Sequence, residues 1–158
     1  MSVCHNNFNP HNVIISEKTR NNVMEGSDFH RLIFSDEHCS TNGIYIHFVL
    51  KNITVEKYFN KIKCCFDNNS INNQTISSIK SIEKMILNKF KNIQNRTLSC
   101  RIQEQLQNGF IKLYGDDNVK YGKQNEINFL LKISGIWASN QANDFGLTFR
   151  FFIFNNQF

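Results

Sequence analysis

Two long runs of apolar and aromatic residues near the end of the chain, 129–137 and 145–154, constrain its fold more than any other feature. Each run is rich in Phe, Ile and Leu, and the polar connector 138–144 separates them. Such runs, bounded by Asn, Asp and Gly, are typical of the two strands of a β-hairpin. Each strand also carries one cation, Lys132 in the first and Arg150 in the second. We therefore expect a C-terminal hairpin that is apolar or aromatic on both faces apart from these two charges.

The turn of this hairpin sets which side chains face each other. A pairing of Ser139 with Asn143 would place three pairs opposite one another, namely Trp137–Phe145, Ile133–Phe149 and Lys132–Arg150. Like charges directly opposite on a sheet repel each other, so the last pair is useful only where an anion such as a phosphate lies between the cations. Two alternatives stay open: both faces are packed against other elements, or a register shifted by two residues separates the charges.

The first half of the chain predicts an arm followed by short strands. Residues 1–12 are polar and rich in Asn and His, which predicts a flexible N-terminal arm. Short apolar or β-branched runs at 13–15, 29–34 and 44–50 predict strands. All three runs are too short for helices, so they favour a sheet.

The segment 53–66 is ambiguous. Its apolar residues fit the stripe of a helix, and they also fit one face of a strand. We favour a strand, because Lys51-Asn52 would make a plausible turn after the run that precedes it.

A helix is the clearest single element, and we expect it over 75–94. Thr75 is a natural N-cap, since its hydroxyl can accept a hydrogen bond from a backbone N–H of the first turn. Apolar residues then recur at spacings of three and four, which is typical of one buried helix face. Lys80 and Lys84 fall on the opposite face, where they form either a solvated surface or a stripe that follows phosphates.

Four strands are expected after this helix. Apolar and polar residues alternate over 98–104, and Asn108-Gly109 leads into a second apolar run at 110–114. Asn-Gly between two such runs is a strong hairpin signal, because both residues tolerate positive φ. With the C-terminal hairpin this predicts one α+β domain over 13–158, β-rich and antiparallel, with one long amphipathic helix and a sheet that could close into an OB-like barrel.

Composition limits the class of protein. The formal net charge is +5, which favours an acidic partner such as nucleic acid. Five cysteines, two of them adjacent, do not form a disulfide framework, and neither a signal peptide nor a membrane span is evident. We therefore expect an intracellular protein without a membrane partner. Abundant Asn, Lys, Ile and Phe have A/T-rich codons and suggest a source such as a large DNA virus.

Signals of catalysis or metal binding are weak. The chain has no nucleophile elbow, phosphate-binding glycine loop or dinucleotide fingerprint. Asp116-Asp117 lies in a predicted loop, where turn chemistry explains both residues. The pairs Cys4-His5 and His38-Cys39 could supply four zinc ligands, but they lack the usual spacing within each pair. We expect no enzyme activity, no metal and no cofactor.

Binding of single-stranded nucleic acid has more support, because cations and aromatic residues interleave in this chain. Proteins that bind single strands combine cations along the backbone with aromatic rings on which bases stack. The residues expected to take part are Lys80, Lys84, Lys132, Trp137, Arg150, Phe152 and Phe154.

A resemblance supports the same expectation. The pattern Leu-Lys-Ile-Ser-Gly-Ile-Trp137, a short polar loop and Phe-Gly-Leu-Thr-Phe-Arg150 resembles the C-terminal hairpin of OB-like single-stranded DNA-binding proteins of large insect DNA viruses. The resemblance covers residues 129–150 and implies that Lys132, Trp137 and Arg150 lie near the functional surface.

The sequence thus predicts a viral, non-enzymatic protein that binds single-stranded nucleic acid. The alternative is a structural or self-assembling viral protein that uses its Phe-rich C-terminal hairpin as a subunit interface. A homo-oligomer is expected in either case, since an exposed apolar strand can pair edge to edge with another chain.

Overall fold

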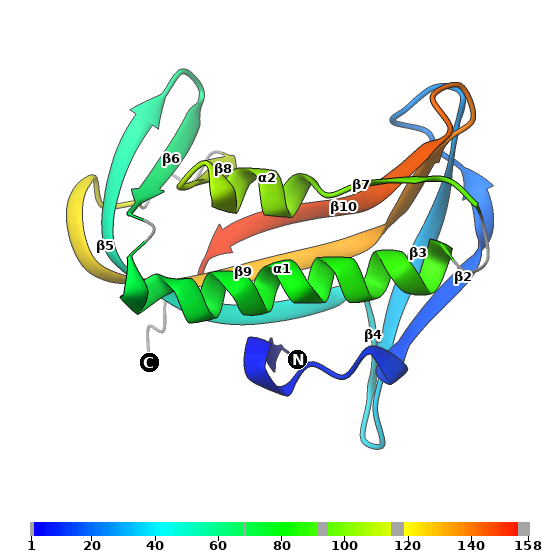
Figure 1. Ribbon diagram of the computed structural model, residues 1–158, viewed down its shortest axis with the longest axis horizontal. Coiled ribbons are helices and arrows are strands. Elements are labelled where there is room, and N and C mark those ends of the chain that lie inside the picture. Colours follow the sequence, from blue (N-terminus) through cyan, green and yellow to red (C-terminus); the bar gives the residue numbers. More distant parts are fainter. Residues whose placement is uncertain (1, 68, 92–94, 115–118, 155–158) are drawn as a thin grey trace.

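A highly curved antiparallel sheet, with helices against it, makes up the computed structural model, which describes residues 2–67, 69–91, 95–114 and 119–154 (Figure 1). Its strands are β1 (Val3–Cys4), β2 (Val13–Arg20), β3 (Ser27–Ser35), β4 (Ser40–Asn42), β5 (Ile44–Tyr58), β6 (Lys61–Phe66), β7 (Thr97–Ser99), β8 (Phe110–Tyr114), β9 (Gly122–Ser139) and β10 (Asp144–Ile153). Its helices are the short η1 (His5–Asn7) and η2 (Pro10–Asn12) and the α-helices α1 (Ser70–Lys91) and α2 (Arg101–Gln107). The α+β class and the antiparallel, β-rich character agree with the sequence prediction.

Strand β9 is the centre of the sheet. One of its edges pairs with β10, and the other pairs first with β5 and then, after Ile133, with β3. The strand order runs β2-β3-β9-β5-β6-β8, and no described pairing joins β2 to β8. The sheet is therefore open, and the OB-like barrel is not seen as a closed ring of strands.

The C-terminal hairpin forms, with a register that changes along its length. Lys132 pairs with Arg150 and Ile133 with Phe149, as predicted. Nearer the turn Trp137 pairs with Gly146 instead of Phe145, because a bulge between Thr148 and Phe149 shifts the register by one residue. The predicted Trp137–Phe145 pair is therefore wrong, since the sequence pattern does not reveal the bulge.

Helix α1 covers one face of the sheet (Figure 1). It begins at Ser70, before the expected N-cap Thr75, and the Asn72 N–H donates to the Asn69 side-chain oxygen at 3.3 Å. The predicted end, 92–94, lies outside the described residues. The Phe90 ring contacts the rings of His30 and Phe145 in the core. The buried side chains of α1 are Asn72, Ile76, Ile79, Ile82, Glu83, Ile86, Leu87 and Phe90.

The ambiguous segment 53–66 is extended, as favoured, but it holds parts of two strands joined by a turn after Tyr58, and the predicted turn at Lys51-Asn52 is wrong. Strand β5 runs through this point without interruption and turns only after Tyr58. Asn52 has a φ of 56°, and the side chain of Asn72 on α1 bonds both to the Lys51 N–H, at 2.9 Å, and to its carbonyl, at 2.8 Å. These contacts hold an irregular backbone conformation at Lys51-Asn52 inside a long strand. In the sequence, these two residues have the pattern of a turn.

The segment after α1 differs from its prediction. Residues 101–107 form α2 instead of a strand, with Ile102 and Leu106 buried one helical turn apart. Asn108 is the C-cap of α2, and Gly109 (φ 76°) leads into β8, so Asn108-Gly109 is not a hairpin turn. Apolar and polar residues alternate over too few positions here for the pattern to distinguish a strand from a helix as short as α2.

The described part of the expected arm, 2–12, packs against the domain. Strand β1 pairs in parallel with β5, and the Phe8 ring lies 6.2 Å from the ring of Phe34. The Lys89 ammonium on α1 donates to the carbonyls of Pro10, at 3.3 Å, and Val13. The segment 2–12 is therefore not a detached arm. Despite its polar composition it adds one short strand to the sheet.

Replacing Ile86 by Ala should lower the free energy of unfolding by about 2–5 kcal/mol, because the fully buried side chain would leave a cavity. Ile71→Ala is the matched control, since Ile71 lies on the same helix and is 55% exposed. Urea unfolding of both variants measures the difference. Equal losses would show that this helix face is not the core contact.

Candidate functional site

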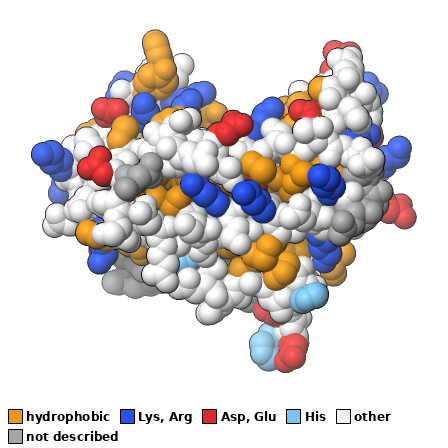
Figure 2. Space-filling model, in the orientation of Figure 1, with side chains coloured by type: hydrophobic (Ala, Val, Ile, Leu, Met, Phe, Trp, Pro, Cys, Tyr) orange, Lys and Arg blue, Asp and Glu red, His pale blue; other side chains and the backbone are white. Residues whose placement is uncertain are grey.

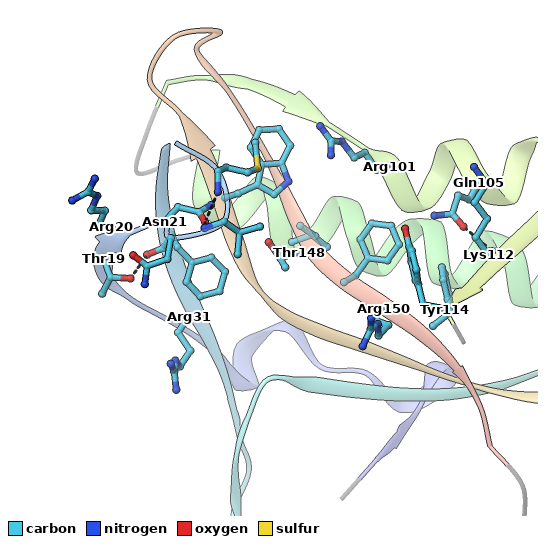
Figure 3. Close-up of a pocket in the computed structure, with 18 residues that line it drawn as sticks. Thr19, Arg20, Asn21, Arg31, Arg101, Gln105, Lys112, Tyr114, Thr148 and Arg150 are labelled. Carbon is cyan, nitrogen blue, oxygen red and sulfur yellow. Dashed lines mark hydrogen bonds between the residues drawn. The ribbon is translucent and has the colours of Figure 1, made fainter. Parts of the chain in front are cut away.

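An open groove of about 790 Å³ brings many functional side chains together. Six elements and the turn between β2 and β3 contribute to its walls, and Figure 3 shows these side chains. Its lining residues are Thr19, Arg20, Asn21, Asn22, Val23, Met24, Phe29, Arg31, Arg101, Gln105, Lys112, Tyr114, Trp137, Leu147, Thr148, Phe149, Arg150 and Phe151. None of them belongs to α1, so the groove and the long helix use different parts of the surface.

The charged side chains that line the groove in the described part of the chain are all positive. Five cations line it there, and no described Asp or Glu does. They are Arg20, Arg31, Arg101, Lys112 and Arg150. Cations that share a concave surface focus the positive potential and attract anions. On the face that carries α1, by contrast, Lys and Arg are scattered among uncharged and acidic side chains (Figure 2).

Strand β10 contributes its edge to the groove. Five consecutive residues, 147–151, line it, although neighbouring side chains of a strand point to opposite faces. The groove therefore follows the edge of the strand. In the described chain β7 pairs with β10 only at 144–146, so no strand pairs with this edge farther along. Backbone N–H and C=O groups are thus available beside the cations.

Tyr114 and Arg150 form the accessible aromatic part of the groove. The Arg150 guanidinium carbon lies 5.4 Å from the centre of the Tyr114 ring and 5.8 Å from that of Phe152. Tyr114 is 54% exposed. In Figure 3 the two side chains lie next to each other, whereas Arg20 extends away from them at the other end of the groove. A ring that is exposed and beside a cation suits stacking of a planar group.

Trp137, which is buried, and Phe29, which is half-buried, form the floor at the other end. Two glycines allow their rings to lie against the sheet: a Cβ on Gly146 would lie 2.7 Å from the Trp137 ring, and one on Gly135 would lie 2.3 Å from the Phe29 ring. Trp137 is only 3% exposed, and the Arg101 guanidinium lies 4.8 Å from its ring centre. Trp137 therefore supports Arg101 and leaves little ring surface for a ligand.

Buried Glu83 on α1 positions α2 and hence Arg101. Its carboxylate oxygens accept hydrogen bonds from the backbone N–H groups of Ile102, at 3.0 Å, and Gln103, at 2.8 Å. Burial raises the pKa of Glu83, which these two N–H groups and Lys84 oppose. The Gln105 side chain also accepts from the Lys112 N–H at 3.2 Å, so α2 is attached to both α1 and β8 (Figure 3).

The residues that the sequence predicted for binding do not form one surface: Lys132 is paired with Arg150 across the hairpin, whereas Lys80 and Lys84 lie on α1. Arg150 and Trp137 line the groove, and Phe152 contacts Arg150 from outside it. Phe154 is 39% exposed at the end of the hairpin, and Lys132 is half-buried with its ammonium 5.6 Å from the Tyr45 ring centre. Lys80 and Lys84 lie on α1 and do not line the groove.

Most of the groove was missed in the sequence, because its cations come from separate elements. Arg20 and Arg31 lie on two paired strands, whereas Arg101 lies on a helix that was predicted as a strand. In β8, Lys112 and Tyr114 alternate with buried residues. This alternation was the one sequence signal that could have indicated an accessible face of the strand. The candidate pair Asp116-Asp117 lies outside the described residues.

The zinc alternative has no support in the part of the chain that is described. Cys4 pairs with His47 across β1 and β5, and His5 lies near His47, so that burial and the His47 charge lower the pKa of His5. His38-Cys39 lies instead in a turn capped by Asp36. Within the described ranges no group of three or more His, Cys, Asp or Glu side chains could hold a metal ion.

The cysteines form no disulfide within the described residues. Burial, together with the neighbouring Cys65, raises the pKa of Cys64 to about 12, so this thiol stays protonated at neutral pH. No helix in the described ranges is long and apolar enough to cross a membrane.

Comparison of the chain with models of protein families, with curated proteins and with solved structures found no match.

Replacing Glu83 by Ala should lower the free energy of unfolding by about 1–3 kcal/mol, because the buried Ile102 N–H would lose its acceptor. Glu17→Ala, at an exposed position of β2, is the control and should change it by less than about 0.5 kcal/mol. Urea unfolding at neutral pH gives both values.

The pH dependence of this effect has a definite sign. The pKa of folded Glu83 lies above its ordinary value of 4.5, so the folded state binds the proton more tightly than the unfolded chain. The contribution of Glu83 to stability is therefore greatest below that value and falls as the pH rises through the folded pKa. Glu83→Gln should lack this fall. A wild-type stability that rises relative to Glu83→Gln over the same range would contradict the assignment.

Proposed function

We propose that this protein binds single-stranded nucleic acid in the groove and does not catalyse a reaction. The observation that carries the proposal is the set of five cations in a groove that also holds the exposed Tyr114, with no carboxylate among the described residues that line it. The comparisons with known proteins do not bear on this proposal.

The charge pattern suits a polyanion. Each phosphate that a cation neutralises releases counterions from the nucleic acid, and this release favours binding at low salt. The unpaired backbone N–H groups along β10 can add hydrogen bonds to phosphate oxygens. The five cations belong to β2, β3, α2, β8 and β10, so they suit a chain of phosphates more than one small anion.

The aromatic side chains favour a single strand over a duplex. A base can stack on a side chain only when it is not already stacked inside a double helix, and such stacking tolerates every base. Tyr114 offers its ring next to Arg150, and Phe152, 38% exposed, is beside the same guanidinium. Cations and accessible rings therefore occur together at one point.

The absence of catalytic groups among the lining residues supports a binding role. Proton transfer in enzymes uses mostly His, Glu and Asp, and covalent catalysis often uses Cys or Ser. None of these residue types occurs among the described residues that line the groove. The polar groups that do line it are mainly cations, amides and hydroxyls suited to anion binding.

The finer expectations from the sequence belong to this proposal. We propose a viral protein that acts inside the host cell, in the nucleus or the cytoplasm, on the basis of the composition and the resemblance of 129–150. An OB-like role is proposed in the limited sense that a curved antiparallel sheet presents cations and rings to the strand.

Self-assembly is the second candidate, and a different observation favours it. Phe152 and Phe154 are 38% and 39% exposed, and the outer edge of β10 has no described strand partner from Leu147 onwards. An edge of this kind can pair with another copy of the chain. Assembly through apolar contacts would not weaken with salt, whereas phosphate binding would.

The groove variant Lys112→Gln with Arg150→Gln tests the proposed function. We expect weaker binding of a labelled single-stranded oligonucleotide, because two cations near Tyr114 are removed. The slope of log K against log salt should fall by roughly 0.7 for each phosphate that is no longer neutralised. Fluorescence anisotropy over a series of salt concentrations measures both quantities.

Lys80→Gln with Lys84→Gln is the matched control, since it removes the same charge from α1. Its affinity and slope should stay close to those of the wild type. Equal losses in the two double variants would mean that net charge alone drives binding and would refute the groove as the site. An unchanged oligomer size in both variants would separate the binding result from assembly.

A further inference from the structure

The outer face of β6 and β8 carries a second group of cations and aromatic rings. Across these strands Lys61 pairs with Tyr114, and Lys63 pairs with Lys112. Paired residues and alternate residues share one face of a sheet, so all four side chains lie on the same side. The opposite face is core, because Ile62, Cys64, Ile111 and Leu113 are buried.

Contacts on this face connect cations to rings. The Lys61 ammonium lies 4.8 Å from the Tyr114 ring centre. The Lys63 ammonium lies 4.7 Å from that of Phe110 and 5.6 Å from that of Tyr58. Tyr114 belongs both to this face and to the groove, so the two surfaces are continuous.

The Lys63–Lys112 pair is unfavourable in the free protein. Like charges directly opposite on a sheet destabilise it. The nearest acid in the register is Glu56, opposite Lys63 in β5, and its carboxylate also accepts a hydrogen bond from the Cys65 thiol at 3.3 Å. A phosphate between Lys63 and Lys112 would reverse the effect of this pair from repulsion to attraction.

The tip of the β5–β6 hairpin adds an aromatic end to this face. Phe59 is 81% exposed with a φ of 53°, and its ring centre lies 4.9 Å from that of Tyr58, which is 45% exposed. Figure 2 shows apolar side chains gathered at this projecting tip, with Lys and Arg side chains close below it. An exposed Phe in the left-handed region is unfavourable for stability, which points to a function for the ring.

We propose that this face, Tyr58, Phe59, Lys61, Lys63 and Phe110, is an outer track that binds the same single strand beyond the groove. The inference rests on the proposed function and extends it. Phosphates contact Lys61 and Lys63, a base at the shared boundary stacks on Tyr114, and the end of the bound segment stacks on the hairpin tip. The protein therefore binds a longer segment than the groove alone holds.

A series of single-stranded oligonucleotides from about 4 to about 16 nucleotides tests the track, since single-strand sites of one small domain cover this range. In the wild type, affinity should rise with length until groove and track are both filled. In Lys61→Gln with Lys63→Gln the rise should stop at a shorter length, and the salt slope for the longest oligonucleotide should fall by roughly 0.7 for each phosphate left without its cation. Phe59→Asn, which suits the positive φ, should bind the longest oligonucleotide at least about fivefold more weakly with an unchanged slope.

The outcomes separate this proposal from the one on which it rests. If Lys61→Gln with Lys63→Gln has the length dependence of the wild type while the groove variant loses affinity at every length, the track is refuted and the groove stands. If no oligonucleotide binds to the wild type, both proposals are refuted. Lys80→Gln with Lys84→Gln should follow the wild-type length dependence, and equal urea midpoints for all variants exclude a loss of fold as the cause.

Discussion

The change of partner along β9 is the constraint on which the rest of the structure depends. This 18-residue strand pairs with β5 up to Ile133 and with β3 from Gly135 onwards, while β10 follows its other edge. The bulge opposite Thr148 and Phe149 falls at the same point, and a bulge bends a strand and increases its twist. β9 and β10 therefore bend together, as Figure 1 shows, and the groove follows β10 across this bend.

Small residues make this change of partner possible. A Cβ on Gly135 would lie 2.5 Å from the His30 carbonyl oxygen, and Gly43 has a φ of 87° beside Ile133. Gly146 likewise leaves room for the Trp137 ring, which a Cβ at this position would clash with. The bend of the sheet and the aromatic floor of the groove thus require glycine at a few positions, whereas Arg101 and Lys112 are placed by α2 and β8.

The sequence predicted the parts that depend on local pattern. The strands within β2, β3 and β5, a helix with Ile79, Ile82, Ile86 and Phe90 inside, and the Lys132–Arg150 pair follow from alternation and helical spacing. It did not predict α2, because the acceptor for the first N–H groups of this helix is Glu83 on another helix. It also missed most of the groove, since the cations that line it are far apart along the chain. Arg150 and Trp137, which the sequence predicted for binding, do line this groove, but their different exposures depend on packing that no local pattern records.

The central claim is that single-stranded nucleic acid binds along β10 and Tyr114. The most direct test is to follow the backbone amide chemical shifts of the protein while a single-stranded oligonucleotide is added. We predict that the largest changes occur at the backbone amides of 147–151 and of Tyr114, with little change at Lys80 and Lys84 on α1. Changes confined to α1, or no changes at an oligonucleotide concentration well above that of the protein, would contradict the claim.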